Sequence, residues 1–364
     1  MNLSSKILIG LLTLAGSPII AADDPADVPA DIPAQSPPTA GAQNNPMQSE
    51  ITPELDHAVE LGIEYLVTTQ LEDGAWASGR FGKNVAITSL ACLALMADGH
   101  IPGRGPIGDS VDRGVEFILN STSENGLITS QANNGPMYGH GFATLFLGEV
   151  YGMTPSTDDA RTTRLHEALV KAIRLIEQTQ SEDGGWRYNP VPYDADVSVT
   201  ICQIMALRSA RNAGIEVSSE VIDRAVEYVR LCQNHDGGFK YQIGSGNSAW
   251  PRTAAGVASL YYAGIYEDDA INKGLAYLQA SAMPGNTSTS RSHYFYGHYY
   301  AVQAMYLAGD EYWATWWPAI REQLISALTD EGSWEDRSVG KTYGTSMALI
   351  ILQMPKRYLP IFQK

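Results

Sequence analysis

Two aspartates stand two residues apart in the segment PYDADVSVT, residues 192–200, and an apolar stretch follows them directly. Neighbouring carboxyl groups can act as acid and base because each one shifts the pKa of the other. An aspartate just before a helix can instead cap it, by accepting hydrogen bonds from the first backbone N–H groups. The sequence leaves both roles open for Asp194 and Asp196, and capping is the simpler expectation.

Polar and aromatic side chains also precede the other apolar stretches of the chain. The candidate ligand-binding residues among them are Tyr138, His140, Trp250, Arg252, Tyr296, His298 and Tyr343. If the apolar stretches are helices whose N-termini meet, these side chains form the rim of one mouth. A polar and aromatic rim above an apolar floor is typical of a site for a small or lipidic ligand.

An internal repeat underlies this spacing. The copies of its motif, Gln-x-x-Asp-Gly-x-aromatic, are QLEDGAW (70–76), QSEDGGW (180–186) and QNHDGGF (233–239), with degenerate copies TSENGLI (122–128) and LTDEGSW (328–334). The long gap before the last copy has room for one repeat without a motif, whose first helix lies near Tyr277–Leu278. The chain therefore contains six repeats.

Each repeat pairs two kinds of helix. An amphipathic helix precedes the motif, as in residues 55–66, and a helix that is apolar nearly all round follows it, as in residues 86–99. A half-buried helix that alternates with a wholly buried one predicts an outer and an inner layer. The expected fold is all-α, an (α/α)6 toroid of six helix pairs, and an open superhelix is the alternative.

The start of the chain has a different composition. Residues 1–22 combine a basic start, a short apolar run and two final alanines, which is the pattern of a secretory signal peptide. Ser17 stands where a lipobox requires cysteine, so we expect no N-terminal lipid. Residues 23–50 are rich in Pro and Ala and predict a disordered linker, which leaves residues 51–364 as the toroid domain. We expect export to the periplasm or the cell exterior, with no transmembrane segment in the mature chain.

Charge and cysteine content exclude some classes. The net charge of −16 argues against a nucleic-acid partner. The three cysteines, Cys92, Cys202 and Cys232, lie in apolar stretches without CxxC spacing, so we expect neither disulfides nor a zinc knuckle. We expect no cofactor and no metal.

The motif resembles that of a known superfamily. YLVTTQLEDGAW (65–76) fits the QW motif of the squalene–hopene cyclases and protein prenyltransferases, and the resemblance covers nearly everything from residue 51 onward. It implies an α/α toroid. In squalene–hopene cyclases an Asp-x-Asp-Asp segment supplies the acid that protonates the isoprenoid. The resemblance places Asp196 at the proton-donating position, whereas Val197 replaces the last acid.

The prenyltransferase side of the resemblance implies a zinc ion. Those enzymes hold it with an Asp, a Cys two residues later and a His from the next repeat. Here Asp196 stands at the cysteine position and the next repeat offers Arg252. We therefore expect no catalytic zinc site.

Closure of the ring makes the first and sixth repeats neighbours. Their loops are alike, SGRFGKN (78–84) and EDRSVGKT (335–342), and they bring together Arg80, Lys83, Arg337 and Lys341. These cations either hold a carboxylate or phosphate or remain solvated charges at the rim.

Three classes of function stay open, and whether the chain is an enzyme stays open with them. The first is an exported terpene-cyclase-like toroid that binds a lipidic, isoprenoid-like or other small ligand, with Asp196 as acid and Asp194 as its modulator. The second is a non-catalytic scaffold that binds a protein partner. The third is a carbohydrate-active enzyme of the polysaccharide lyase or glycosidase type. A deep apolar funnel favours the first class, exposed aromatics in a shallow groove favour the third, and a plugged mouth favours the second.

Overall fold

The computed structural model describes residues 50–130, 135–154, 159–288 and 292–363. The predicted signal peptide and all of the predicted linker except Glu50 lie outside these ranges.

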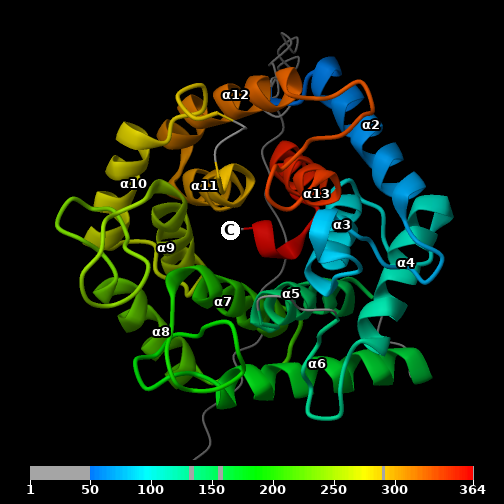
Figure 1. Cartoon of the computed structure of the whole chain (residues 1–364), viewed down its shortest axis with the longest axis horizontal. Coiled ribbons are helices and arrows are strands. Elements are labelled where there is room, and N and C mark those ends of the chain that lie inside the picture. The colour runs from blue at the N-terminus through cyan, green and yellow to red at the C-terminus, as the bar shows by residue number, and fades with distance from the viewer. Residues whose placement is uncertain (1–49, 131–134, 155–158, 289–291, 364) are drawn as a thin grey trace, which may run out of the picture. The chain divides into compact units, whose positions relative to one another are not determined.

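Two layers of helices form the described structure, with no β-strand in these ranges. The outer layer comprises α2 (Pro53–Thr69), α4 (Gly105–Asn120), α6 (Ala160–Gln178), α8 (Ser219–Leu231), α10 (Asp269–Ser281) and α12 (Asp310–Ser326). The inner layer comprises α3 (Val85–Ala97), α5 (Met137–Met153), α7 (Val197–Asn212), α9 (Trp250–Tyr262), α11 (Tyr294–Ala308) and α13 (Lys341–Leu352). Figure 1 shows the inner helices as a ring inside the outer ones. The predicted (α/α)6 toroid is confirmed.

The ring is closed. The last inner helix, α13, packs against the first, α3, and α12 packs against α2. Across this seam the Ser78 hydroxyl donates to the carbonyl of Val339 at 2.9 Å, and the Thr342 hydroxyl donates to the carbonyl of Ala77 at 2.9 Å. The open superhelix is therefore wrong for this chain.

The motif glutamines tie three outer helices, α2, α6 and α8, to the next outer helix. The Gln180 side-chain amide donates to the carbonyls of Gly184, at 2.7 Å, and of Val221 in the first turn of α8, at 2.8 Å. The Trp186 indole is buried and donates to the carbonyl of Ile176 at 2.8 Å. Gln70 and Gln233 make the equivalent pairs of hydrogen bonds. The motif is structural, and its glutamine satisfies a carbonyl of the neighbouring outer helix.

The C-terminal segment closes one end of the inner ring. It contains the short helices η2 (Met354–Lys356) and η3 (Pro360–Phe362), and η3 packs against α5 and α7. Figure 1 shows this segment inside the ring. Ile361 and Phe362 are buried, and the Ile361 N–H donates to the carboxylate of Glu149 at 3.0 Å. Because Glu149 lies in the last part of α5, the closed end is the one at which the inner helices finish.

Candidate functional site

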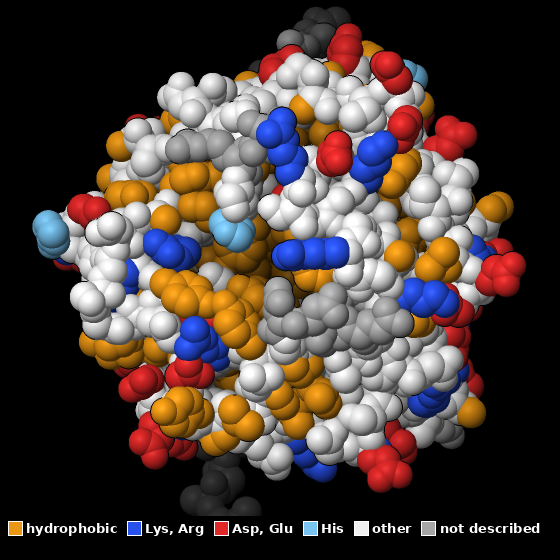
Figure 2. Space-filling model, viewed as in Figure 1, with side chains coloured by type: hydrophobic (Ala, Val, Ile, Leu, Met, Phe, Trp, Pro, Cys, Tyr) orange, Lys and Arg blue, Asp and Glu red, His pale blue; other side chains and the backbone are white. Residues whose placement is uncertain are grey.

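The six inner helices all begin at the other end of the ring, where the loops after the motifs form its mouth. Figure 2 views this face and shows a hollow near its middle. Hydrophobic side chains wall the hollow, and Lys and Arg side chains lie at its edge.

Asp196 is the N-cap of α7 and is fully buried. Its Oδ1 accepts hydrogen bonds from the N–H groups of Ser198, at 2.8 Å, and Val199, at 3.0 Å. Its Oδ2 accepts from the Tyr241 hydroxyl at 3.1 Å. Burial raises the pKa of Asp196 to about 6, although these hydrogen bonds and Arg187 act to lower it. The capping role is confirmed, and both carboxylate oxygens are engaged.

Asp194 is partly exposed and forms an ion pair with Arg187. The Nε of the same guanidinium lies 3.9 Å from Oδ2 of Asp196. The guanidinium also lies over the rings of Tyr188, at 5.3 Å, and Tyr241, at 5.8 Å. The structure therefore brings both predicted aspartates to one cation, and burial, not a second carboxylate, raises the pKa of Asp196.

Arg187, Tyr188 and Tyr241 were not predicted from the sequence. The two tyrosine hydroxyls hydrogen-bond to each other at the boundary between the third and fourth repeats. A signal for them exists, because each tyrosine stands two residues after the aromatic residue of its motif, Trp186 or Phe239.

The three predicted tyrosines do gather at the mouth. Tyr138, Tyr296 and Tyr343 are half-buried near the starts of α5, α11 and α13. Burial raises the pKa of Tyr138 and of Tyr296, and neighbouring ionisable groups that include Asp196 raise both further. The start of α7 and the three tyrosines thus share one part of the mouth.

Trp250 and Arg252 lie in the first turn of α9 and have different surroundings. The Trp250 ring packs against His298, with centroids 4.9 Å apart. Arg252 donates to the carbonyl of Asn247 at 2.8 Å, and its guanidinium lies 6.0 Å from the centre of the Tyr241 ring. Arg252 therefore adjoins the Asp196 cluster through Tyr241, whereas Trp250 packs between helices.

The expected rim position of His140 and His298 is wrong. Both side chains are fully buried. His140 Nδ1 accepts from the N–H of Ile128 at 3.2 Å, and His298 Nε2 lies 2.9 Å from the hydroxyl of Thr287. Other repeats use threonine at this place, as where Thr200 accepts from the N–H of Trp186. Burial lowers the pKa of His140 to about 4 and that of His298 to about 3, so both are neutral at pH 7 and hold the loops before α5 and α11.

Ring closure does place the four predicted cations in adjacent loops, joined by the seam described above. The lysines, however, are paired with motif acids of their own repeats, Lys83 with Asp73 and Lys341 with Glu331. Arg80 lies over the ring of Phe81 at 5.1 Å, and Arg337 is exposed. Because Asp73 and Glu331 offset the charges of the two lysines, this side of the mouth carries less positive charge than the four cations alone would give.

Aromatic side chains fill the axis of the ring below the mouth. Phe142 of α5 meets Tyr299 of α11 with ring centroids 6.2 Å apart, and these helices come from opposite sides of the ring. Cys202 of α7 lies 3.4 Å from the Tyr300 hydroxyl. All four side chains are buried. The hollow is thus shallow and ends on an aromatic floor, unlike the deep apolar funnel that the sequence left open.

Within the described ranges no three His, Cys, Asp or Glu side chains come together in a group that could hold a metal ion. The same residues include no helix of the length and apolarity needed to cross a membrane. Cys92, Cys202 and Cys232 are free and buried, as expected.

Comparison with known proteins agrees with this fold. Residues 157–316 match the family model of the squalene-hopene cyclase C-terminal domain. The sequence matches no curated protein.

Solved structures of two enzyme classes are similar to the toroid. A type II terpene cyclase, MstE from Scytonema, has a TM-score of 0.57 and 15% identity, over 83% of this chain and 98% of that one. The GH76A alpha-1,6-mannanase of Salegentibacter sp. HEL1_6 has a TM-score of 0.62 and 10% identity, over 82% of this chain and 98% of that one. At these identities the likeness shows the fold alone.

The matched family model and the closed toroid agree with each other. The described chain thus has the α/α toroid fold, and residues 157–316 are similar to a squalene-hopene cyclase domain.

Proposed function

We propose that this chain is an exported toroid that binds a small isoprenoid-like ligand in the hollow at its mouth. The hydrophobic wall of that hollow carries the proposal, together with Tyr138, Tyr296 and Tyr343 at the starts of helices that surround the mouth. The hollow ends on an aromatic floor and is not a deep funnel, so we propose a small ligand that is held at the mouth. Aromatic faces contact an apolar chain well and stabilise positive charge on it. The C-terminal segment closes the other end of the ring, so ligand enters from the mouth.

Two comparisons support the ligand class. The family model that residues 157–316 match is that of the squalene-hopene cyclase C-terminal domain, and squalene is an isoprenoid. The similar terpene cyclase has been solved with geranylgeranyl dihydroxybenzoate, its substrate, which is an isoprenoid joined to a polar ring. We extend that ligand class to this chain.

Acid catalysis by Asp196 is the finer part of the proposal. A pKa of about 6 keeps part of the carboxyl protonated in mildly acidic solution, which suits a proton donor. The burial of Asp196 and the hydrogen bond from Tyr241 to Oδ2 oppose this role. We propose that the chain binds its ligand with Asp196 covered, and that proton transfer requires the Tyr241 hydroxyl to leave Oδ2.

The mannanase likeness favours a glycosidase as the second candidate. Hydrolysis of a glycosidic bond requires two carboxyl groups on either side of that bond. Asp194 and Asp196 instead approach one guanidinium, that of Arg187, and Asp196 is buried. This arrangement makes the isoprenoid candidate the better one.

Calorimetric titration with farnesyl phosphate, farnesol and mannotriose tests the proposal. We expect a prenyl compound to bind the wild-type protein and Tyr138→Ala to weaken it by about tenfold, the effect of one lost aromatic contact of 1–2 kcal/mol. Tyr193→Ala is the matched control. Tyr193 is also a tyrosine, but it is 87% exposed and lies in the loop before α7. Binding of mannotriose, with no prenyl compound bound, would reverse the order of the candidates.

Two further measurements test the finer claims. Mass spectrometry of the prenyl compound after incubation with wild type and Asp196→Asn separates binding from chemistry, since only catalysis changes the compound and only in wild type. The intact mass of the protein from cell fractions tests export, for which we expect a chain without residues 1–22 outside the cytoplasm.

A further inference from the structure

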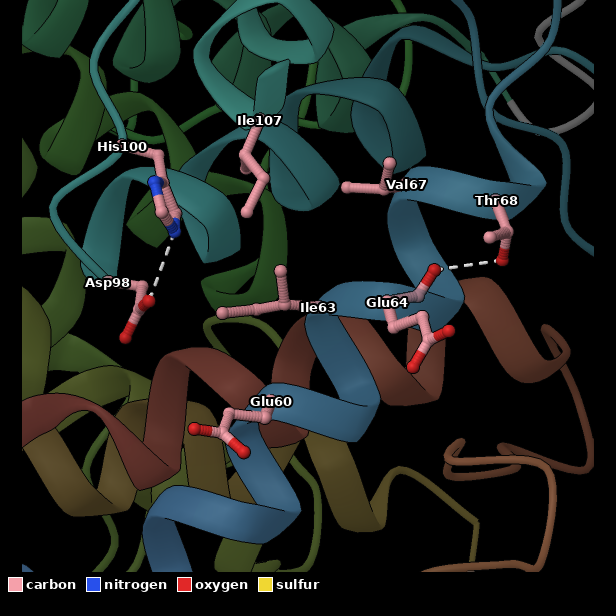
Figure 3. Close-up of a pocket in the computed structure, with 8 residues that line it drawn as sticks. All are labelled: Glu60, Ile63, Glu64, Val67, Thr68, Asp98, His100 and Ile107. Carbon is pink, nitrogen blue, oxygen red and sulfur yellow. Dashed lines mark hydrogen bonds and ion pairs between the residues drawn. The ribbon is translucent and has the colours of Figure 1, made fainter. Parts of the chain in front are cut away.

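A groove of about 440 Å³ lies in the outer layer. It runs between α2 and α4, and Figure 3 shows its lining. The lining residues are Glu60, Ile63, Glu64, Val67, Thr68, Asp98, His100 and Ile107. Ile63, Val67 and Ile107 form an apolar surface, and the carboxylates of Glu60 and Glu64 project from α2 beside it. The groove thus combines an apolar floor with an acidic edge.

The charge at this edge is negative. Asp98 is compensated, since it pairs with Lys356 and lies 3.1 Å from Nε2 of His100. Glu60 and Glu64 are exposed, and α2 contains no Lys or Arg. His57 approaches Glu60 at 4.0 Å, but both side chains are solvated, and such a pair offsets little charge.

The repeat provides an internal comparison. An equivalent groove lies between α6 and the segment before α8. Counted back from the motif tryptophan, Glu177 there takes the place of Val67, and Arg174 takes the place of Glu64. Glu177 accepts a hydrogen bond from the N–H of Ser218 at 2.9 Å, which bridges that groove. The groove between α2 and α4 thus differs from its equivalent in two ways: Val67 replaces the bridging glutamate, and Glu64 replaces the arginine.

We propose that the groove between α2 and α4 binds a basic amphipathic helix of a partner protein. The apolar stripe of such a helix would cover Ile63, Val67 and Ile107, and its Lys or Arg side chains would approach Glu60 and Glu64. Residues 23–50 of the chain itself carry acids and no Lys or Arg, so charge disfavours them as the occupant. This surface is separate from the mouth, and the proposal stands independently of the ligand proposed there.

Fluorescence anisotropy with a labelled helical Leu/Lys peptide of 14 residues tests the proposal. We expect binding that weakens with salt, and a loss of about tenfold in Glu60→Lys/Glu64→Lys, in line with two lost charge contacts. The matched control is Glu220→Lys/Glu267→Lys, two exposed acids on other parts of the ring, which gives the same net charge. The control should bind within about twofold of wild type. Val67→Ser, which changes no charge, should also weaken binding because it removes apolar contact.

Several results would overturn the proposal. Equal weakening in both double variants would mean general attraction to an acidic protein. Equal binding of a Leu/Glu peptide would remove the role of Glu60 and Glu64. A dimer in light scattering that Glu60→Lys/Glu64→Lys converts to a monomer would assign the groove to a second copy of the chain. All four exchanged acids are exposed, so we expect each variant to fold. Thermal unfolding of each variant checks this.

Discussion

The hydroxyl of Tyr241 donates a hydrogen bond to the buried carboxylate of Asp196 at 3.1 Å, from the loop of the following repeat. Two further bonds join the same segments. The Val197 N–H donates to the carbonyl of Tyr241 at 3.0 Å, and the Gln242 side chain donates to the carbonyl of Ala195 at 2.8 Å. The cap of α7 is thus held by its neighbour, and the two loops form one side of the mouth.

Asp196→Asn should make stability less sensitive to pH. Asparagine also caps helices, but it carries no charge that burial could disfavour. Because the folded pKa is raised from 3.8 to about 6, the stability of the carboxyl form is fully present below about pH 4 and is lost as the pH rises through 6. From pH 4 to pH 8 the free energy of unfolding of wild type should fall by about 2 kcal/mol relative to that of the variant. Urea unfolding at both pH values measures this, and a constant difference would contradict it.

His140→Ala should destabilise the fold by about 2–3 kcal/mol, because the buried N–H of Ile128 loses its acceptor. His140→Thr should cost less, since threonine performs this role in other repeats. Thermal unfolding followed by circular dichroism at pH 7 compares the two variants. Equal losses would show that the hydrogen bond to Ile128 does not matter.

The same histidines predict sensitivity to acid. Burial depresses the pKa of His140 from 6.5 to about 4 and that of His298 to about 3. The stability that the neutral rings provide is present above pH 6.5 and is lost as the pH falls through these values. In urea unfolding from pH 7 to pH 4, His140→Thr should therefore lose less stability than wild type does. A variant that follows the wild-type curve would show that His140 does not titrate in this range.

Gln180→Ala should cost about 2–3 kcal/mol, because the carbonyls of Gly184 and Val221 lose a shared donor in a buried place. The equivalent Gln70 is partly exposed, so water can replace its amide in Gln70→Ala, which should cost less than about 1 kcal/mol. Chemical denaturation of the two variants gives both values. If Gln70→Ala lost more stability than Gln180→Ala, burial would not determine how much the motif glutamine stabilises the fold.

Phe362→Ala should lower the free energy of unfolding by about 3–4 kcal/mol, since it leaves a cavity at the closed end of the ring. Gln363→Ala, one residue further on and exposed, serves as control and should change it by less than about 0.5 kcal/mol. A melting temperature unchanged by Phe362→Ala would mean that the C-terminal segment is not part of the cooperative unit.

The repeat made the fold predictable, because the same residue types make the same contacts in each copy. Gln70, Gln180 and Gln233 all bond a carbonyl of the next outer helix, so a spacing seen in the sequence reports a spacing in the structure. The capping role of Asp196 was predictable for the same reason, since it depends only on local sequence.

The site was less predictable, because its contacts join different repeats. Tyr241 reaches Asp196 across 45 residues, and nothing in either segment alone indicates that pairing. An alignment of the repeats could have predicted the structural role of His140 and His298. Tyr343-Gly344-Thr345 aligns with Tyr-Gly-His in both segments, and Thr345 holds its motif at the equivalent place by accepting from the N–H of Trp334.

The seam of the ring also bears on how the protein folds. The hydrogen bond between Ser78 and Val339 joins residues 261 positions apart, and that between Thr342 and Ala77 joins residues 265 apart. An open array of repeats can add stable pieces in order, but here α3 lacks one neighbour until α13 has been synthesised. The slowest contacts to form are thus the ones that complete the core, and a partly made chain exposes the apolar flanks of both terminal repeats.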